Sequence, residues 1–305
     1  MTFQEAIAFL KMKSEEKDQI LQMIFAGDKY AKLNFLPVHT FTLPVNTKNA
    51  VEAGIIKPEN AAFTEKNLIV NYTDNTMYKY NLFLMDLLAN FDWKRPINFS
   101  ATGMSDPADM FFLRDYLQFD GFSYRLVPIK TTQEDTPRGD IGRVDAEELY
   151  KTVKNFKWGN FKNLYNHYDE IATSNIMSYR LTASRAAQAL VEKGDKKRAL
   201  EVLDLASSEI PFEKYNDPRS VDDMVYSYLL AGNEKKALAL AAKVQSNTLQ
   251  DYNYYKSLDK EHQNTMKKDM ASQPYYYSMI AKSIANAYSK NGEKEKSVKE
   301  SSSQK

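Results

Sequence analysis

The sequence contains no cysteine, which removes several kinds of chemistry at once. Without a thiol there is no thiolate nucleophile, no disulfide, no iron–sulfur cluster and no thiolate zinc site. Histidine is scarce too, since His39, His167 and His262 stand far apart and show no metal-ligand spacing. Neither G-x-G-x-x-G nor G-x-x-x-x-G-K occurs among the 10 glycines, so no loop that holds phosphates is expected. We therefore expect no metal, no nucleotide and no other cofactor.

An excess of one charge is also missing, with 41 basic residues against 40 acidic ones. A nearly neutral chain has no global field with which to hold nucleic acid, and nucleic acid is not an expected partner. Long apolar runs are lacking as well, because the longest, residues 82–91, carries Asp86 and is far shorter than the ~18 residues of a membrane span. The first residues show no signal-peptide pattern. The chain is expected to be soluble, either cytoplasmic or cut from a longer protein.

Material for catalysis is sparse. The acidic segments 133–140 and 168–170 hold carboxylates of the kind that a glycosidase uses in pairs. Solvated acids in loops are far more common than catalytic ones, and nothing in the sequence brings these two segments together. No catalytic residue is assigned, and a free-standing carbohydrate-active enzyme is the weakest of three functional hypotheses.

Aromatic residues are abundant, with 20 tyrosines, 16 phenylalanines and 2 tryptophans. The tyrosine clusters at residues 252–255 and 275–277 have two interpretations. Flat amphipathic rings line grooves for carbohydrate or peptide. In helical repeats, however, large rings also fill the spaces beside small residues between helices, and this packing role is the favoured interpretation.

The first half of the chain alternates helical and strand-like patterns. Residues 3–26 have apolar residues at three- and four-residue steps, with a second helix start at Ser14. The elements predicted next are a strand with Phe41, Leu43 and Val45 on one face, a hairpin of residues 67–72 and 77–81, a helix over 82–91, a strand over 96–100, a helix over 106–119 and a strand over 122–129. Helices between strands imply crossovers. The prediction is a helical segment over 1–27, then an α/β domain over 28–142 with a small mixed, partly parallel sheet.

Beyond residue 143 every periodic segment is helical, and a repeat is visible. Segments 186–211 and 224–243 share small residues around a glycine, and the stretches GDKKRAL and GNEKKAL that begin at these glycines are predicted to be solvated turns between helices. A weaker third copy, around Gly292, is predicted at 284–298. The spacing is typical of tetratricopeptide repeats, whose paired helices touch at small side chains. The predicted packing residues are Ala187, Gly194, Ala199, Ala206, Pro211, Tyr228, Gly232 and Ala237. The predicted fold class is α+β, with an all-α tetratricopeptide-like domain over 143–292 and a disordered tail over 293–305.

The segment FDWKRPINFS, residues 91–100, places Trp93, two cations and Pro96 before a short apolar run. Proline fixes the backbone and needs no ladder partner at the start of a strand, so the favoured interpretation is a lead-in from helix to strand. Docking of a partner comes second and catalysis third. The residues assigned to docking are Trp93, Lys94, Arg95, Tyr124, Arg125, Arg143 and Trp158.

Three motifs in order resemble a known family, and KALALA-type repeats follow them. The motifs are WKRPINFS (93–100), LRDYLQFDGFSYRLVPIK (113–130) and GRVDAEELYKTVKNFKWGN (142–160). Together they resemble the C-terminal soluble region of bacterial polytopic membrane proteins catalogued as domain of unknown function 2723. That family is similar to membrane glycosyltransferases that use lipid-linked sugar donors, and to protein O-mannosyltransferases. None of the three motifs is a catalytic signature.

The resemblance implies a bundle of membrane helices that carries the acidic catalytic residues, with the present chain outside the membrane on the periplasmic face of a bacterial inner membrane. The implied partners are that N-terminal membrane domain and an acceptor protein or glycan. The first hypothesis is therefore a non-catalytic extracytoplasmic domain that binds or positions an acceptor. The alternative is a helical-repeat interaction scaffold that binds a peptide in a groove of residues 165–245, without a transferase role.

Overall fold

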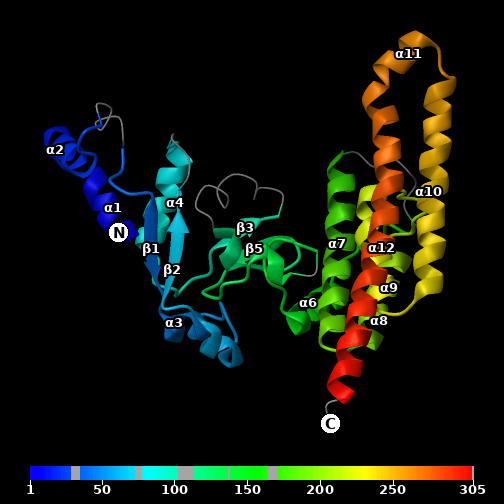
Figure 1. The fold of residues 1–305 in the computed structure, drawn as a ribbon, viewed down its shortest axis with the longest axis horizontal. Helices are drawn as coiled ribbons and strands as arrows, with labels where there is room; N and C mark the ends of the chain where they lie inside the picture. Colours follow the sequence, from blue (N-terminus) through cyan, green and yellow to red (C-terminus); the bar gives the residue numbers. More distant parts are fainter. Residues whose placement is uncertain (29–34, 73–76, 102–112, 137, 164–169, 304–305) are drawn as a thin grey trace. The chain divides into compact units, whose positions relative to one another are not determined.

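The computed structural model describes residues 1–28, 35–72, 77–101, 113–136, 138–163 and 170–303. The chain divides into two compact units, Met1–Arg143 and Val144–Lys305. The first unit holds two small sheets and short helices, and the described part of the second unit is built of helices (Figure 1). The chain is thus a mixed α+β protein with a helical C-terminal part.

The first unit is made of short elements. In chain order these are α1 (Phe3–Leu10), α2 (Ser14–Ile24), β1 (Thr40–Pro44), α3 (Thr47–Glu52), η2 (Pro58–Phe63), β2 (Asn67–Asn71), α4 (Lys79–Ala89), β3 (Asn98–Ser100), η3 (Leu113–Tyr116), β4 (Leu117–Phe119), β5 (Ser123–Leu126) and η4 (Gln133–Asp135), where η marks a 3-10 helix. Helix α1 begins with a capping box, because the Thr2 hydroxyl accepts from the Glu5 amide and the Glu5 carboxylate accepts from the Thr2 amide. The predicted helix start at Ser14 is confirmed.

Strands β1 and β2 lie side by side as a two-stranded antiparallel sheet (Figure 1). Phe41 is opposite Val70 and Leu43 is opposite Leu68, and all four side chains are buried. Alternate burial is what a strand with one face on the core produces. The predicted inward face of the first strand is therefore confirmed at Phe41 and Leu43.

The predicted mixed, partly parallel sheet is wrong. Strands β3, β5 and β4 form a second sheet in that spatial order, and every pair of named strands in the two sheets is antiparallel. Strands β4 and β5 are joined only by residues 120–122, where Gly121 has a φ of 109°. A parallel connection needs a crossover of a dozen residues or more. In the described part of the chain, parallel pairing is confined to two isolated bridges, Thr2 with Thr42 and Gln118 with Arg143.

Two local predictions in the first unit are also wrong. Residues 77–81 are not a hairpin strand, because α4 begins at Lys79 and the Tyr78 amide donates to the Asn81 Oδ1 at 2.7 Å, which stabilises a helix start. The partner of β2 is β1 instead. The helix predicted over 106–119 fails at its end, where residues 117–119 are the buried strand β4, and its residues 106–112 lie outside the described residues.

The second unit is made of helices stacked side by side. In chain order these are α6 (Ala146–Lys154), α7 (Glu170–Glu192), α8 (Lys196–Glu209), η5 (Pro218–Ser220), α9 (Asp222–Leu230), α10 (Glu234–Ser257), α11 (Lys260–Thr265) and α12 (Lys267–Ser303). Helix α9 is central, since it packs against α7, α10 and α12. Helix α12 runs to Ser303 and so includes most of the segment for which the sequence predicts disorder.

Two helical hairpins, α7–α8 and α9–α10, turn in the same way. Gly194 and Gly232 have φ values of 82° and 89°, the left-handed conformation that glycine adopts most easily after a helix. The residue after each glycine caps the next helix: Asp195 accepts from the Arg198 amide and Asn233 accepts from the Lys236 amide. The two predicted inter-helix turns are confirmed.

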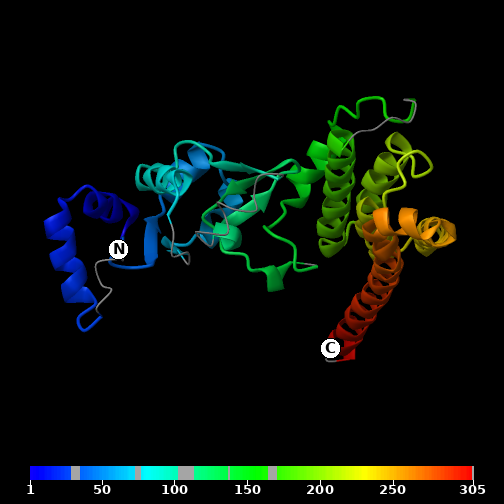
Figure 2. The ribbon, with the colours of Figure 1, turned by 90° about the horizontal axis from the view of Figure 1, so that it is seen from above.

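The predicted third copy, at residues 284–298, is wrong. Gly292 lies inside α12, which passes through it without a turn. Figure 2 shows this helix, coloured orange to red, running unbroken to the C-terminal end. The tyrosine-rich stretch 252–277 forms the end of α10, all of α11 and the start of α12.

Candidate binding groove in the helical unit

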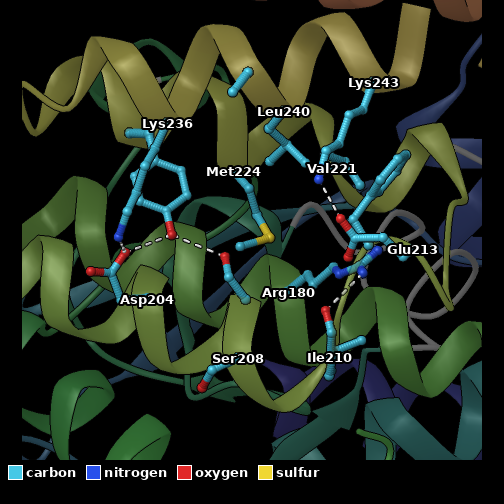
Figure 3. Close-up of a pocket in the computed structure, with 14 residues that line it drawn as sticks. Arg180, Asp204, Ser208, Ile210, Glu213, Val221, Met224, Lys236, Leu240 and Lys243 are labelled. Carbon is cyan, nitrogen blue, oxygen red and sulfur yellow. Dashed lines mark hydrogen bonds and ion pairs between the residues drawn. The ribbon is translucent and has the colours of Figure 1, made fainter. Parts of the chain in front are cut away.

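A groove of about 390 Å³ opens between α8, α9 and α10 in the second unit (Figure 3). Helix α8 and the loop after it form one wall, α10 forms the other, and α9 forms the floor. The residues that line it are Arg180, Asp204, Ser207, Ser208, Ile210, Phe212, Glu213, Val221, Met224, Tyr228, Lys236, Ala239, Leu240 and Lys243.

One end of the groove is a polar cluster centred on Asp204. Its Oδ1 accepts from the Lys236 Nζ at 2.7 Å and from the Tyr228 hydroxyl at 2.9 Å. Ser207 lies 2.9 Å from the same hydroxyl. Burial of the Tyr228 ring raises the pKa of its hydroxyl, and the charge of Asp204 adds to this, while the hydrogen bond with Ser207 opposes it. The tyrosine is therefore a neutral hydrogen-bonding group at physiological pH.

The other end of the groove holds a second ion pair, Lys243 with Glu213. The hydrogen bond from Lys243 lowers the pKa of the Glu213 carboxyl, and the positive charge of Arg180 contributes in the same direction. Lys236 and Lys243 are seven residues apart on α10, which is two helical turns or about 10 Å. Each lysine thus reaches across the groove to a carboxylate on the opposite wall, as Figure 3 shows.

Between the two ion pairs the groove is apolar. Val221 and Met224 of the floor are almost fully buried, and Leu240 and Ala239 present the side of α10. Phe212 adds an apolar ring to the wall formed by the loop after α8. An apolar floor with a few oriented polar groups at its ends is the usual composition of a ligand site. This arrangement suits a ligand with an apolar group in the middle and hydrogen-bonding groups on both sides.

The loop wall is held in place from below by Arg180 of α7, whose side chain is only 1% exposed. Its guanidinium donates to the carbonyls of Ile210 and Tyr215, at 3.0 and 2.8 Å, and to the Ser220 hydroxyl at 2.6 Å. A planar fork of donors fixes several acceptors at once. Arg180 therefore positions the loop that carries Phe212 and Glu213.

The docking residues predicted before β3 belong to the first unit and are not among the residues that line this groove. Trp93 is fully buried, with its indole Nε1 donating to the Pro44 carbonyl at 2.8 Å, so it has no surface to offer a partner. Its φ of 65° is unusual for a bulky residue. Lys94 and Arg95 are exposed, and Lys94 pairs with Asp92 at 2.7 Å. The lead-in from a helix to a strand is confirmed, because α4 ends at Ala89 and β3 begins at Asn98.

The other predicted docking residues are spread over both units. Tyr124 is buried in β5, while Arg125 bonds to Asp120 and to the Gly54 carbonyl. Arg143 is half-buried and bridges to Gln118. Trp158, in the second unit, is half-buried in an aromatic cluster with Tyr179, at a centroid distance of 5.2 Å. The predicted set is divided between the units, with six residues in the first and Trp158 in the second, and a docking role for its exposed members stays a prediction.

Five of the predicted packing residues are buried side chains on helices of the second unit. The buried members are Ala187, Ala199, Ala206, Tyr228 and Ala237. Pro211 follows the end of α8. These positions fit paired helices, whereas tetratricopeptide-like character stays a prediction. Of the whole set, Tyr228 alone also lines the groove.

Sequence reasoning pointed to the region of the groove but missed its polar residues. Lys236 belongs to the stretch GNEKKAL, which is typical of a solvated turn, yet its ammonium is paired across the groove. The sequence gives a weak indication of a special role for Asp204, because it is an acidic residue within the apolar-periodic stretch of α8. No sequence signal identifies Arg180, because its burial is explained only by its three hydrogen-bond acceptors in residues 210–220, which lie far along the chain.

Comparison with known families finds a match in the N-terminal part of the chain. Residues 1–148 match the family model described as TMEM260-associated domain 2. The matched region ends close to the boundary between the two units and covers the first unit. It ties the N-terminal part of this chain to a membrane-protein family. No curated protein and no solved structure matches the chain.

In the parts of the chain that the structure covers, no helix combines the length and apolarity needed to cross a bilayer. Within the same residues, no three histidine, aspartate or glutamate side chains converge as metal ligands would.

Proposed function

We propose that this chain is a non-catalytic binding module that belongs with a membrane-embedded glycosyltransferase-like protein and positions an acceptor polypeptide for it. The proposal places the chain outside the membrane, on the periplasmic face of a bacterial inner membrane. Its support is the match of the first unit to a domain of a membrane-protein family, together with the groove in the second unit.

The groove is the main structural support for the proposed binding role. Its apolar floor is about 10 Å long between the two ion pairs, which is the length of three residues of extended peptide. Lysines on one wall and carboxylates on the other offer partners to a peptide's amides, carbonyls and charged side chains. An apolar side chain of the acceptor would occupy the space above Met224 and Leu240.

The direct test is peptide selection on the full chain. A library of random peptides of about 12 residues, longer than the groove, is panned against the chain, and the Kd of each selected peptide is measured by calorimetry. Ala239 lies on the exposed wall of α10 inside the groove, so Ala239→Trp fills the site without disturbing the core. We expect this variant to lose peptide binding.

Ala242→Trp is the matched control. It makes the same substitution on the same helix at an exposed position that does not line the groove. We expect it to bind the selected peptides as the unmodified chain does. Peptides that bind Ala239→Trp and the unmodified chain equally well would place peptide recognition elsewhere and contradict the proposal.

The alternative, an interaction scaffold without a transferase role, is favoured by one observation, the equivalent turns of the α7–α8 and α9–α10 hairpins. Both functions predict peptide binding in the groove, so a second measurement separates them. Sugar transfer to a selected peptide is measured with the membrane-embedded partner and either the unmodified chain or Ala239→Trp. Reduced transfer with the variant supports acceptor positioning, whereas unchanged transfer favours the scaffold.

A further inference from the structure

Helix α4 of the first unit presents apolar side chains to solvent as well as to the core. Its inner face buries Asn81, Leu84, Met85, Leu88 and Ala89. On the outer side Phe83 is 70% exposed, Leu82 and Leu87 are each 39% exposed, and Tyr78 and Tyr80 just before them are 53% and 44% exposed. Single exposed apolar residues are ordinary, but here five fall between residue 78, directly before α4, and residue 87.

Two charges flank the centre of this outer face. Lys79 and Asp86 are seven residues apart, so they lie on the same side of α4, one on each side of Leu82 and Phe83. Both are exposed, and within the described residues no ion pair involves either side chain. The order along the face is therefore cation, apolar pair, anion.

This order is self-complementary. We propose that the outer face of α4 binds the same face of a second copy of this chain, with the two helices antiparallel. A twofold axis between Leu82 and Phe83 then places Lys79 of each copy level with Asp86 of the other, and Leu87 level with Tyr78. A parallel arrangement would oppose Lys79 to Lys79, so charge selects the antiparallel one.

The twofold arrangement also limits the assembly. The same patch is used on both copies, which closes the interface at a dimer and leaves no free copy of the patch. Helix α4 has 11 residues and is about 16 Å long, so its face supplies only part of the ~800 Å² per partner of a standard interface. The dimer is accordingly weak, with a dissociation constant of about 100 µM.

The interface is tested by analytical ultracentrifugation of the full chain from about 10 µM to about 1 mM at low salt. We expect a monomer–dimer equilibrium. Phe83→Ser should leave the chain monomeric, because Phe83 stands at the centre of the face. Circular dichroism should be unchanged, since the side chain is mostly exposed.

Charge reversal gives the sharper test. Lys79→Glu or Asp86→Lys alone creates two like-charge contacts per dimer, and each should raise the dissociation constant about tenfold. The double variant Lys79→Glu/Asp86→Lys restores both opposite-charge contacts with the signs exchanged, and dimerisation should return. Lys130→Glu makes the same charge change at an exposed position away from α4 and should have no effect.

Three results would overturn the proposal. The first is a chain that stays monomeric at about 1 mM. The second is a double variant that dimerises no better than its two parents, because then the pairing of residues 79 and 86 is not the contact. The third is binding to vesicles of neutral phosphatidylcholine that Phe83→Ser abolishes while self-association is absent, which would assign the face to a lipid surface.

Discussion

Lys236 of α10 and Asp204 of α8 join the two walls of the groove, with 2.7 Å between Nζ and Oδ1. The Tyr228 hydroxyl of α9 donates to the same oxygen, so three helices meet at one carboxylate. Because both side chains of the ion pair are about half exposed, screening by water makes the pair itself contribute little to stability. Its consequence is local, since it fixes where charge and hydrogen-bonding groups stand at this end of the groove.

Tyr228 makes stability depend on pH at alkaline values. Burial raises the pKa of its hydroxyl above the ordinary value of 10.0, so the folded state holds this proton more tightly than the unfolded state. The contribution is fully present below pH 10 and is lost as the pH rises toward the folded-state pKa. Urea unfolding at several alkaline pH values should show a steeper loss for the unmodified chain than for Tyr228→Phe.

The exposed Tyr254 provides the control for this measurement, being 60% exposed on α10. Tyr254→Phe should reproduce the alkaline loss of the unmodified chain. Equal slopes for the unmodified chain and Tyr228→Phe would mean that Tyr228 does not cause the pH dependence.

Arg180→Lys should destabilise the helical unit by about 3 kcal/mol, because an ammonium cannot reach all three acceptors of the guanidinium and leaves buried carbonyls unsatisfied. Urea unfolding followed by circular dichroism measures this change. The loop with Phe212 and Glu213 would lose its anchor, so the affinity for groove-binding peptides should fall as well. Arg219→Lys is the control, since Arg219 forms a half-exposed pair with Asp217 and its replacement should cost less than about 0.5 kcal/mol. Equal losses for both variants would contradict the anchoring role.

Three glycines with the same predicted role should respond differently to alanine. Gly194→Ala and Gly232→Ala each force a left-handed conformation on a residue with a Cβ and should cost about 1 kcal/mol. No heavy atom crowds the added carbon at either site, so the cost is that of the backbone. Gly292→Ala lies inside α12 and should be neutral or stabilising by up to about 1 kcal/mol. A loss of stability from Gly292→Ala as large as that from Gly194→Ala or Gly232→Ala would support the predicted third copy of the repeat.

Trp93→Phe should loosen the first unit alone. The substitution removes the indole donor and leaves the Pro44 carbonyl at the end of β1 without that hydrogen bond, which costs about 1–3 kcal/mol. Hydrogen exchange measured by mass spectrometry should then show faster exchange in β1 and β2. Trp158→Phe, in the second unit, should leave exchange in these strands unchanged, and unchanged exchange in Trp93→Phe would show that the bond does not hold the strand.

The sequence was most informative about features that depend on neighbouring residues. The start of α2 at Ser14, the inward face of β1 at Phe41 and Leu43, and the turns at Gly194 and Gly232 all follow from local periodicity and backbone preference. The prediction of a third copy around Gly292 is wrong because glycine permits a left-handed turn without requiring one. The contacts of α12 with α9 and α10 extend the helix through it.

Strand pairing and the groove were decided by tertiary structure. Helices between strands suggested a partly parallel sheet, but the partner of β2 is β1 and the partners of β5 are β3 and β4, pairings that only the packed core selects. Lys236 and Asp204 are 32 residues apart, and the acceptors of Arg180 lie 30 to 40 residues beyond it. The sequence by itself thus determined the start of α2, the inward face of β1 and where the two helical hairpins turn, since those choices are made within a few residues. The groove and the outer face of α4 arose only when distant segments packed, because burial decides which side chains are covered and which stay exposed.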